Sequence, residues 1–167
     1  MKMGLEKLNQ AEIIDLLGSI YEHSPWVAEV LFSQGITSQD DDVGFLAERM
    51  KKIVDASSEE LKLNLLKAHP ELAGKLAISG NLTKDSTAEQ ASAGLDQCSK
   101  AEFSEFSKLN FEYTKKFGHP FIIAVKGLTR SEILTSFKER INNDGQKEFE
   151  TALAEVHKIA LLRLKAL

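Results

Sequence analysis

The sequence contains repeated helix-start signals and few residues that interrupt helices. Of its 167 residues, only three are proline and ten are glycine. In a capping box, a Ser, Thr or Asn side chain accepts from the backbone N–H three residues later, where a Glu reaches back to the cap. This spacing occurs in NQAE (9–12), SSEE (57–60), STAE (86–89), SKAE (99–102) and TRSE (129–132). The repetition predicts a helical chain.

Other start and stop signals extend this prediction. Ser24 followed by Pro25 is typical of an N-cap with proline in the first turn. The DDD run at 40–42 also indicates a helix start, and Gly35 and Gly118 indicate helix ends. Together these rules predict about seven or eight helices. The expected ranges are 9–21, 24–34, 42–56, 58–68, 87–97, 99–117, 129–141 and 144–166.

One stretch, FIIAV at 121–125, has the composition of a strand. The sequence offers no second convincing strand to pair with it, so we expect an irregular extended segment instead of a sheet. A chain of 167 residues is long enough to bury a substantial core. The predicted fold is therefore all-α: a single-domain helical bundle over 1–167 with one buried, extended connection.

Composition excludes several classes of protein. A net charge of −4 and a pI of about 5.6, without clustered Lys and Arg, argue against nucleic-acid binding. No window approaches the ~20 apolar residues of a membrane span, and the polar stretch MKMGLEKLNQAE does not resemble a signal peptide. The single cysteine, Cys98, excludes an internal disulfide and fits a reducing compartment. We therefore expect a cytoplasmic protein that binds neither nucleic acid nor membranes.

Motifs for metals and nucleotides are also missing from the sequence. There is no HxxxH, HExxH or paired Cys/His spacing, and no GxSxG, Walker or GxGxxG motif. We expect no metal site.

His69 is the first residue that a plain bundle does not explain. It follows the apolar run LKLNLLKA and precedes Pro70. Proline keeps the residue before it out of α geometry, so the imidazole is carried on a fixed bend. Such a bend is either a functional site or simply the end of a helix.

Arg163 is the second residue that a plain bundle does not explain. It falls within the apolar stripe of the last helix, and an arginine is seldom buried without an anionic partner. Either it binds an anion or its guanidinium reaches water near the helix end. Leu161 and Leu162 face the other way and are either a subunit contact or ordinary surface leucines.

The third feature that a plain bundle does not explain consists of two segments with polar groups. Ser86 and Glu89 either complete a capping box or begin a helix whose amides bind an anion or carbonyl, with Gln90 adding an amide. The backbone of 121–125 needs partners for its N–H and C=O groups. Neighbouring side chains or water supply them, or an amide-rich ligand such as a cyclic urea does.

Five blocks of the sequence, in order, resemble the 2-oxo-4-hydroxy-4-carboxy-5-ureidoimidazoline (OHCU) decarboxylase family. They are SPWVAE (24–29), HPELAGKLA (69–77), LTKDSTAEQASAGL (82–95), LNFEYTKKFGHPFIIAVKG (109–127) and EVHKIALLRL (155–164). The resemblance covers nearly the whole chain. It implies an all-helical homodimer that converts OHCU to (S)-allantoin in urate breakdown, without a metal or organic cofactor.

The resemblance also implies a set of site residues, which coincide with the three features above. The implied catalytic residues are His69, Glu89 and Arg163. The implied substrate contacts are Pro70, Ser86, Thr87, Ala88, Glu89, Gln90, Phe121, Ile122, Ile123, Ala124, Val125 and Arg163. The sequence departs from the family pattern at Glu71, where Asp is more frequent, and at His119, where an aromatic residue is common.

These residues suggest a mechanism as a hypothesis. His69 donates a proton, Arg163 binds an anionic or carbonyl oxygen, and Glu89 either holds the substrate hydroxyl or fixes the His69 tautomer. Two alternatives are a non-catalytic helical module that binds a ligand or partner, and an amidohydrolase acting on the same ring system. The amidohydrolase would need a metal or an activated nucleophile, which no motif here provides.

Overall fold

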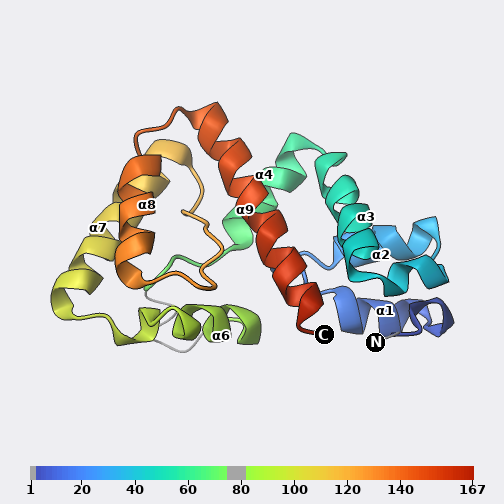
Figure 1. Cartoon of the computed structure of the whole chain (residues 1–167). Helices are drawn as coiled ribbons and strands as arrows, with labels where there is room; N and C mark the ends of the chain where they lie inside the picture. Colours follow the sequence, from blue (N-terminus) through green and yellow to red (C-terminus); the bar gives the residue numbers. More distant parts are fainter. Residues whose placement is uncertain (1–2, 75–81) are drawn as a thin grey trace. The chain divides into compact units, whose positions relative to one another are not determined.

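The computed structural model describes residues 3–74 and 82–167. The regular elements of this part of the chain are helices, which confirms the all-α prediction (Figure 1). The α-helices are α1 (Gln10–Leu17), α2 (Trp26–Gln34), α3 (Val43–Asp55), α4 (Glu59–Ala68), α6 (Lys84–Ser92), α7 (Lys100–Phe117), α8 (Arg130–Arg140) and α9 (Gly145–Lys165). Three short 3-10 helices accompany them: η1 (Leu5–Lys7), η2 (Ser38–Asp41) and η3 (Leu95–Gln97).

Most helix ends lie where the local signals predict them. Asn9, Ser99 and Thr129 each form a complete capping box at the start of α1, α7 and α8. Gly35 and Gly118 follow α2 and α7 with φ of 95° and 78°. Glycine reaches these values without a Cβ clash, so both residues stop their helices as expected.

Three of the predicted caps are wrong, and the first two lie before α4 and α2. The SSEE box (57–60) is displaced by one residue, because the N–H of Leu61 donates to Ser58 Oγ at 3.1 Å. Ser24 does not cap its helix with its side chain. Its hydroxyl donates instead to the carbonyl of Glu22 at 2.9 Å.

The STAE box (86–89) is also wrong, since α6 begins earlier than expected. Thr83 is the N-cap, and its Oγ1 accepts from the N–H of Ser86 at 3.2 Å. The earlier start places Asp85 in the first turn, where the positive end of the helix dipole favours a carboxylate. It also buries Ser86 and Gln90 on one face of the helix.

The chain divides into two compact units. Unit 1 comprises Met1–Ala68 and His157–Leu167, and unit 2 comprises His69–Val156. In unit 1, α2 packs against both α1 and α3. The core of this unit includes the fully buried side chains of Leu5, Ile13, Leu17, Leu31 and Leu46.

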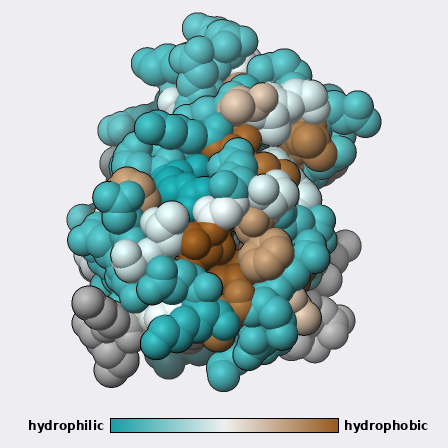
Figure 2. All heavy atoms as spheres, turned by 90° about the vertical axis from the view of Figure 1, so that its right-hand side faces the viewer, coloured by the Kyte–Doolittle hydropathy of each residue, from teal (hydrophilic) through white to brown (hydrophobic). Residues whose placement is uncertain are grey.

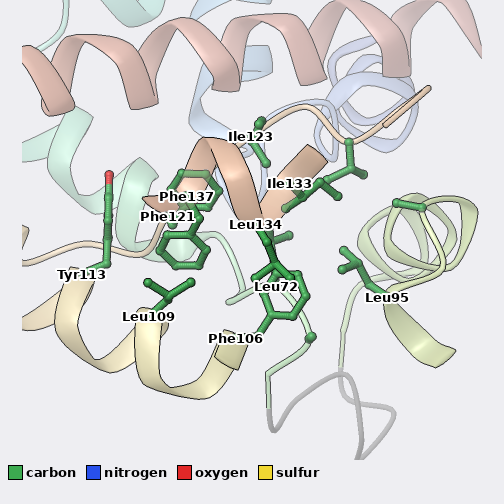
Figure 3. Packing of buried hydrophobic residues seen from close by; sticks show 13 residues of the cluster. Leu72, Leu95, Phe106, Leu109, Tyr113, Phe121, Ile123, Ile133, Leu134 and Phe137 are labelled. Carbon is green, nitrogen blue, oxygen red and sulfur yellow. The ribbon is translucent and has the colours of Figure 1, made fainter. Parts of the chain in front are cut away.

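The core of unit 2 is a hydrophobic cluster that includes residues of α7, of α8 and of the 121–125 segment (Figure 3). The rings of Phe121 and Phe137 are stacked with their centroids 4.0 Å apart. Four of the five side chains of 121–125 are buried, and the segment belongs to no helix or paired strand. This confirms the prediction of an irregular, buried connection.

The molecular face drawn in Figure 2 is mainly hydrophilic, with hydrophobic residues at several places among the hydrophilic ones. The exposed large hydrophobic side chains include Val30, Phe45, Leu61, Phe111 and Leu167. None of the described helices is long and apolar enough to cross a membrane.

Replacing Thr83 by alanine tests the revised start of α6. The free energy of unfolding should fall by about 1 kcal/mol, because the N–H of Ser86 loses its acceptor. Chemical denaturation followed by circular dichroism measures this. Thr135→Ala is the control, since Thr135 lies inside α8 and bonds back to Ser131 without capping. Equal stability of the two variants would contradict the assignment of Thr83 as the cap.

Candidate functional site

His69 lies directly after the last residue of α4, as the His-Pro pair predicts. Its side chain is buried, with 8% of the residue exposed, and Pro70 is half-buried. The residue therefore lies at a bend, outside regular helix. The last residues of the HPELAGKLA motif, 75–77, lie outside the described residues.

The loop that follows His69 is held by two buried amide side chains. The N–H of Ala73 donates to Gln90 Oε1 at 3.0 Å, and Gln90 Nε2 donates to the carbonyl of Glu71 at 3.2 Å. From α7, Asn110 Nδ2 donates to the carbonyl of Leu72 at 3.0 Å. Ala73 adopts a left-handed φ of 52°, which a residue with a Cβ adopts at some cost. The three hydrogen bonds hold this strained turn in place.

The predicted binding residues 86–90 lie within α6. Ser86 and Gln90 are buried, Glu89 is half-buried, and Thr87 and Ala88 are exposed. The N–H of Thr87 donates to the carbonyl of Thr83 at 2.9 Å, so this amide and that of Ser86 already have partners in the helix. The idea that these amides form a helix N-terminus is therefore wrong. Gln90 is joined to the His69 loop through the two hydrogen bonds of its side chain.

The backbone of 121–125 obtains several of its partners from the protein. The carbonyl of Ile122 accepts from Arg140 Nη1 at 2.6 Å, and the N–H of Ala124 donates to Glu155 Oε1 at 3.1 Å. The carbonyl of Val125 accepts from the N–H of Leu128 at 3.0 Å. For these groups, neighbouring residues supply the hydrogen bonds.

A polar network lies beneath this segment. Glu148 is completely buried and accepts from Arg140 Nε at 2.7 Å, from Tyr113 Oη at 2.6 Å and from Asn143 Nδ2 at 3.0 Å. Burial, followed by the hydrogen bond to Glu148, raises the pKa of Tyr113 well above its usual range. The tyrosine therefore remains a donor at physiological pH.

His119 is buried among aromatic rings. Its ring lies edge-on to Tyr113 with centroids 5.6 Å apart, and its Nδ1 is 3.0 Å from the carbonyl oxygen of Pro120, to which an Nδ1–H donates. Burial lowers the pKa of His119. The side chain is therefore neutral at pH 7 and has a packing role beside the segment.

Arg163 is buried in unit 1, with 7% of the residue exposed. Its Nη2 lies 2.7 Å from Glu22 Oε2, and its Nη1 donates to the carbonyl of Ser19 at 3.2 Å. Glu22 is itself only 2% exposed. The alternative in which the guanidinium reaches water is therefore wrong.

A second set of contacts in unit 1 fixes the turn that carries Glu22. The hydroxyl of Tyr21 is 2.8 Å from His157 Nδ1, and His157 Nε2 is 2.9 Å from Asp55 Oδ1. Burial lowers the pKa of His157 and raises that of Tyr21. The α9 helix thus binds this turn through both His157 and Arg163.

The two units divide the predicted site residues. His69, 86–90 and 121–125 belong to unit 2, whereas Arg163 belongs to unit 1. The convergence of His69 and Arg163 on one ligand stays a prediction. Within residues 3–74 and 82–167, no three His, Cys, Asp or Glu side chains are grouped so as to hold a metal ion.

Several partners of these residues were not predicted from the sequence. Glu22 is 141 residues from Arg163, and no local rule connects them. Glu148 and Glu155 offered a signal, because they share the buried face of α9 with Ala152 at helical spacing. A carboxylate at an apolar position predicts a buried cation or donor nearby.

Comparison with known proteins gives a consistent result. A family model described as OHCU decarboxylase matches residues 6–165. The 2-oxo-4-hydroxy-4-carboxy-5-ureidoimidazoline decarboxylase of Haloferax volcanii is 41% identical over 96% of this chain and 91% of its own length. The uric acid degradation bifunctional protein PucL of Bacillus subtilis is 39% identical over 96% of this chain and 32% of its own length.

Two solved structures are similar as well. A crystal structure of (S)-allantoin synthase has a TM-score of 0.77 and 36% identity, and the match covers 97% of this chain but only 52% of that one. This chain therefore spans about half the length of that protein. A crystal structure of OHCU decarboxylase in the presence of (S)-allantoin has a TM-score of 0.69 and 27% identity over 95% of this chain and 97% of that one.

Replacing Arg163 by methionine should destabilise the protein by about 3–5 kcal/mol, because it removes the guanidinium that lies 2.7 Å from the buried carboxylate of Glu22. Chemical denaturation gives the free energy of unfolding. The double variant Glu22→Gln/Arg163→Met removes both charges and should recover most of the loss. A single variant as stable as the wild type would contradict the buried ion pair.

Replacing His119 by phenylalanine should make the unfolding free energy less dependent on pH. Unfolded histidine takes up a proton near pH 6.5, whereas burial keeps His119 neutral to lower pH. The unfolded state therefore binds more protons below about pH 6.5, and wild-type stability falls there by up to about 1.4 kcal/mol per pH unit for this group. Denaturation between about pH 5 and 8 should show that the unfolding free energy of the variant rises relative to that of the wild type as the pH falls. If the unfolding free energies of the two proteins changed in parallel with pH, a lowered pKa of His119 in the folded state would be contradicted.

Proposed function

The chain belongs to the OHCU decarboxylase family, and from this premise we propose that it decarboxylates OHCU to (S)-allantoin in urate catabolism. The observation that carries the proposal is the match of the family model to residues 6–165, which reaches into both units. The similarity to an OHCU decarboxylase whose structure was solved with (S)-allantoin supports the same substrate class.

The substrate itself explains why the reaction needs no organic cofactor. Its carboxylate is attached to a carbon beside an imidazoline C=N bond. When CO₂ leaves, the electron pair of the broken C–C bond delocalises into that C=N. The protein has to align the breaking bond with the π system, stabilise the charge and deliver a proton.

We assign the proton transfer to His69. An unperturbed imidazole has a pKa of about 6.5, which makes histidine the usual side chain for general acid catalysis at physiological pH. It is buried at a bend whose following loop is fixed by Gln90 and Asn110. A donor held in this way reaches one face of the ring, which accounts for a product of one hand. Glu89 holds the substrate hydroxyl or keeps the His69 tautomer fixed.

Arg163 binds an anionic or carbonyl oxygen of the substrate in this proposal. The planar guanidinium presents five N–H donors in a rigid fork. The ion pair with Glu22 at 2.7 Å sets the plane of the fork before the substrate binds. The energetic cost of ordering the side chain is therefore not incurred on binding.

Two segments bind the ureido group and the ring in this proposal. These are the 86–90 stretch of α6 with Pro70, and the 121–125 segment. Gln90 contributes through its remaining hydrogen-bonding capacity, because a carboxamide has two donors and two lone pairs and the loop uses one of each.

We further propose that 1–167 acts as one OHCU decarboxylase domain and forms a homodimer in the cytoplasm. The family match includes residues from both units. The half-buried Leu161 and Leu162 of α9 are candidates for the subunit contact. A single cysteine fits a reducing compartment.

His69→Asn should fold normally and lose about 10²–10⁴-fold in kcat, because the proton donor is removed. OHCU is generated in situ from urate, its disappearance is followed by ultraviolet absorbance, and the handedness of the allantoin by circular dichroism. His23→Asn is the control: His23 is exposed and adopts a left-handed φ of 48°, which Asn tolerates. Wild-type turnover in His69→Asn would remove His69 from the chemistry. A racemic product from the wild-type protein would contradict protonation on one face.

A further inference from the structure

The 121–125 segment shows the alternation of an extended chain. Phe121, Ile123 and Val125 belong to the hydrophobic cluster of unit 2, and the residues between them do not (Figure 3). Side chains that alternate in this way indicate an extended backbone. In such a backbone, the N–H and C=O groups of successive residues point to opposite edges. Ile122 and Ala124 therefore share one edge, and the main-chain groups of Ile123 point to the other.

Two buried charged side chains lie along the edge that Ile122 and Ala124 share. Arg140 Nη1 donates to the carbonyl of Ile122 at 2.6 Å, and Glu155 Oε1 accepts from the N–H of Ala124 at 3.1 Å. They bind the segment where a neighbouring strand would bind it in a sheet. Hydrogen bonds with one charged partner are roughly twice as strong as neutral ones.

The guanidinium of Arg140 is itself fixed on several sides. Its Nε donates to Glu148 Oε1 at 2.7 Å, and its central carbon lies 4.3 Å from the centre of the Phe121 ring. Glu148 Oε1 also accepts from Tyr113 Oη at 2.6 Å. The position of the Ile122 carbonyl is thus tied to α7, α8 and α9 through one side chain.

We propose that Arg140, assisted by Glu155, is a positioning residue for the reaction. It holds the 121–125 segment so that the main-chain groups of Ile123, on the opposite edge, face the substrate in a fixed orientation. This inference rests on the proposed function, because it requires that the segment binds OHCU.

The same helix provides a matched control in Arg130. Its Nε donates to Glu102 Oε2 at 2.9 Å and its Nη1 to the carbonyl of Gly94 at 2.8 Å. Both arginines of α8 therefore join a carboxylate and a main-chain carbonyl through the same two nitrogens. Only the carbonyl bound by Arg140 belongs to the 121–125 segment.

The test compares Arg140→Lys with Arg130→Lys. A lysine keeps the charge beside the carboxylate, but one ammonium cannot reproduce the two-armed contact of the fork. With OHCU generated from urate, Arg140→Lys should lower kcat/KM by about a hundredfold, mainly through KM, since a displacement of about 1 Å costs that much. Arg130→Lys should keep the wild-type kcat and KM.

Glu155 gives a second readout that stability alone would not produce. Glu155→Gln keeps a neutral acceptor for the N–H of Ala124, whereas Glu155→Leu removes the acceptor, so Glu155→Gln should raise KM much less than Glu155→Leu. If Arg140→Lys does not fold, Arg140→Met/Glu148→Gln replaces it. This pair is neutral and still offers Tyr113 an acceptor.

The outcomes separate the two proposals. Wild-type protein without turnover overturns the proposed function. Wild-type turnover together with equal KM values for the Arg140 and Arg130 variants overturns the positioning role alone. Equal KM values for Glu155→Gln and Glu155→Leu would also overturn the positioning role alone.

Discussion

The completely buried carboxylate of Glu148 needs a cation and several hydrogen-bond donors, since an uncompensated charge in the interior costs several kcal/mol. Arg140, Tyr113 and Asn143 supply them from α8, from α7 and from the turn before α9. Because Arg140 also binds the carbonyl of Ile122, the requirement to neutralise one acid sets the path of an irregular segment. The helices of unit 2 thereby control a stretch of chain that has no regular structure of its own.

Unit 1 also contains a buried ion pair, but in this unit α9 contributes the cation instead of the acid. There the buried arginine is on α9 and the acid, Glu22, lies in a turn after α1. A buried ion pair adds little net stability, but breaking it is costly. Its contribution here is orientation, since Tyr21 and His157 fix the same turn.

The sequence predicts the helices well where one local signal is decisive. At α1, α7 and α8 only one residue fits the cap rule, and these helices begin after Asn9, Ser99 and Thr129. At α6, Thr83 and Ser86 both satisfy the local rule, and burial of the helix face decides between them. The segment 121–125 was predictable because its apolar residues demand burial.

The site was predictable only in part, because its long-range contacts follow no local pattern. The apolar stripe left open whether the guanidinium of Arg163 is buried or reaches water, and it does not indicate which acid accompanies it, since the partner is 141 residues away. His69 was predicted at a bend because the Pro70 constraint is local. The amides that hold its loop come from α6 and α7, and composition alone does not indicate them.

The carboxamide of Gln90 has a consequence for how this region tolerates change. It gives one hydrogen bond to the loop and receives another. A glutamate at this position would place an oxygen against the carbonyl of Glu71, so the nearly isosteric exchange is the damaging one. These two hydrogen bonds couple the loop to the helix, so a shift of α6 would also displace Glu71, which is two residues after His69.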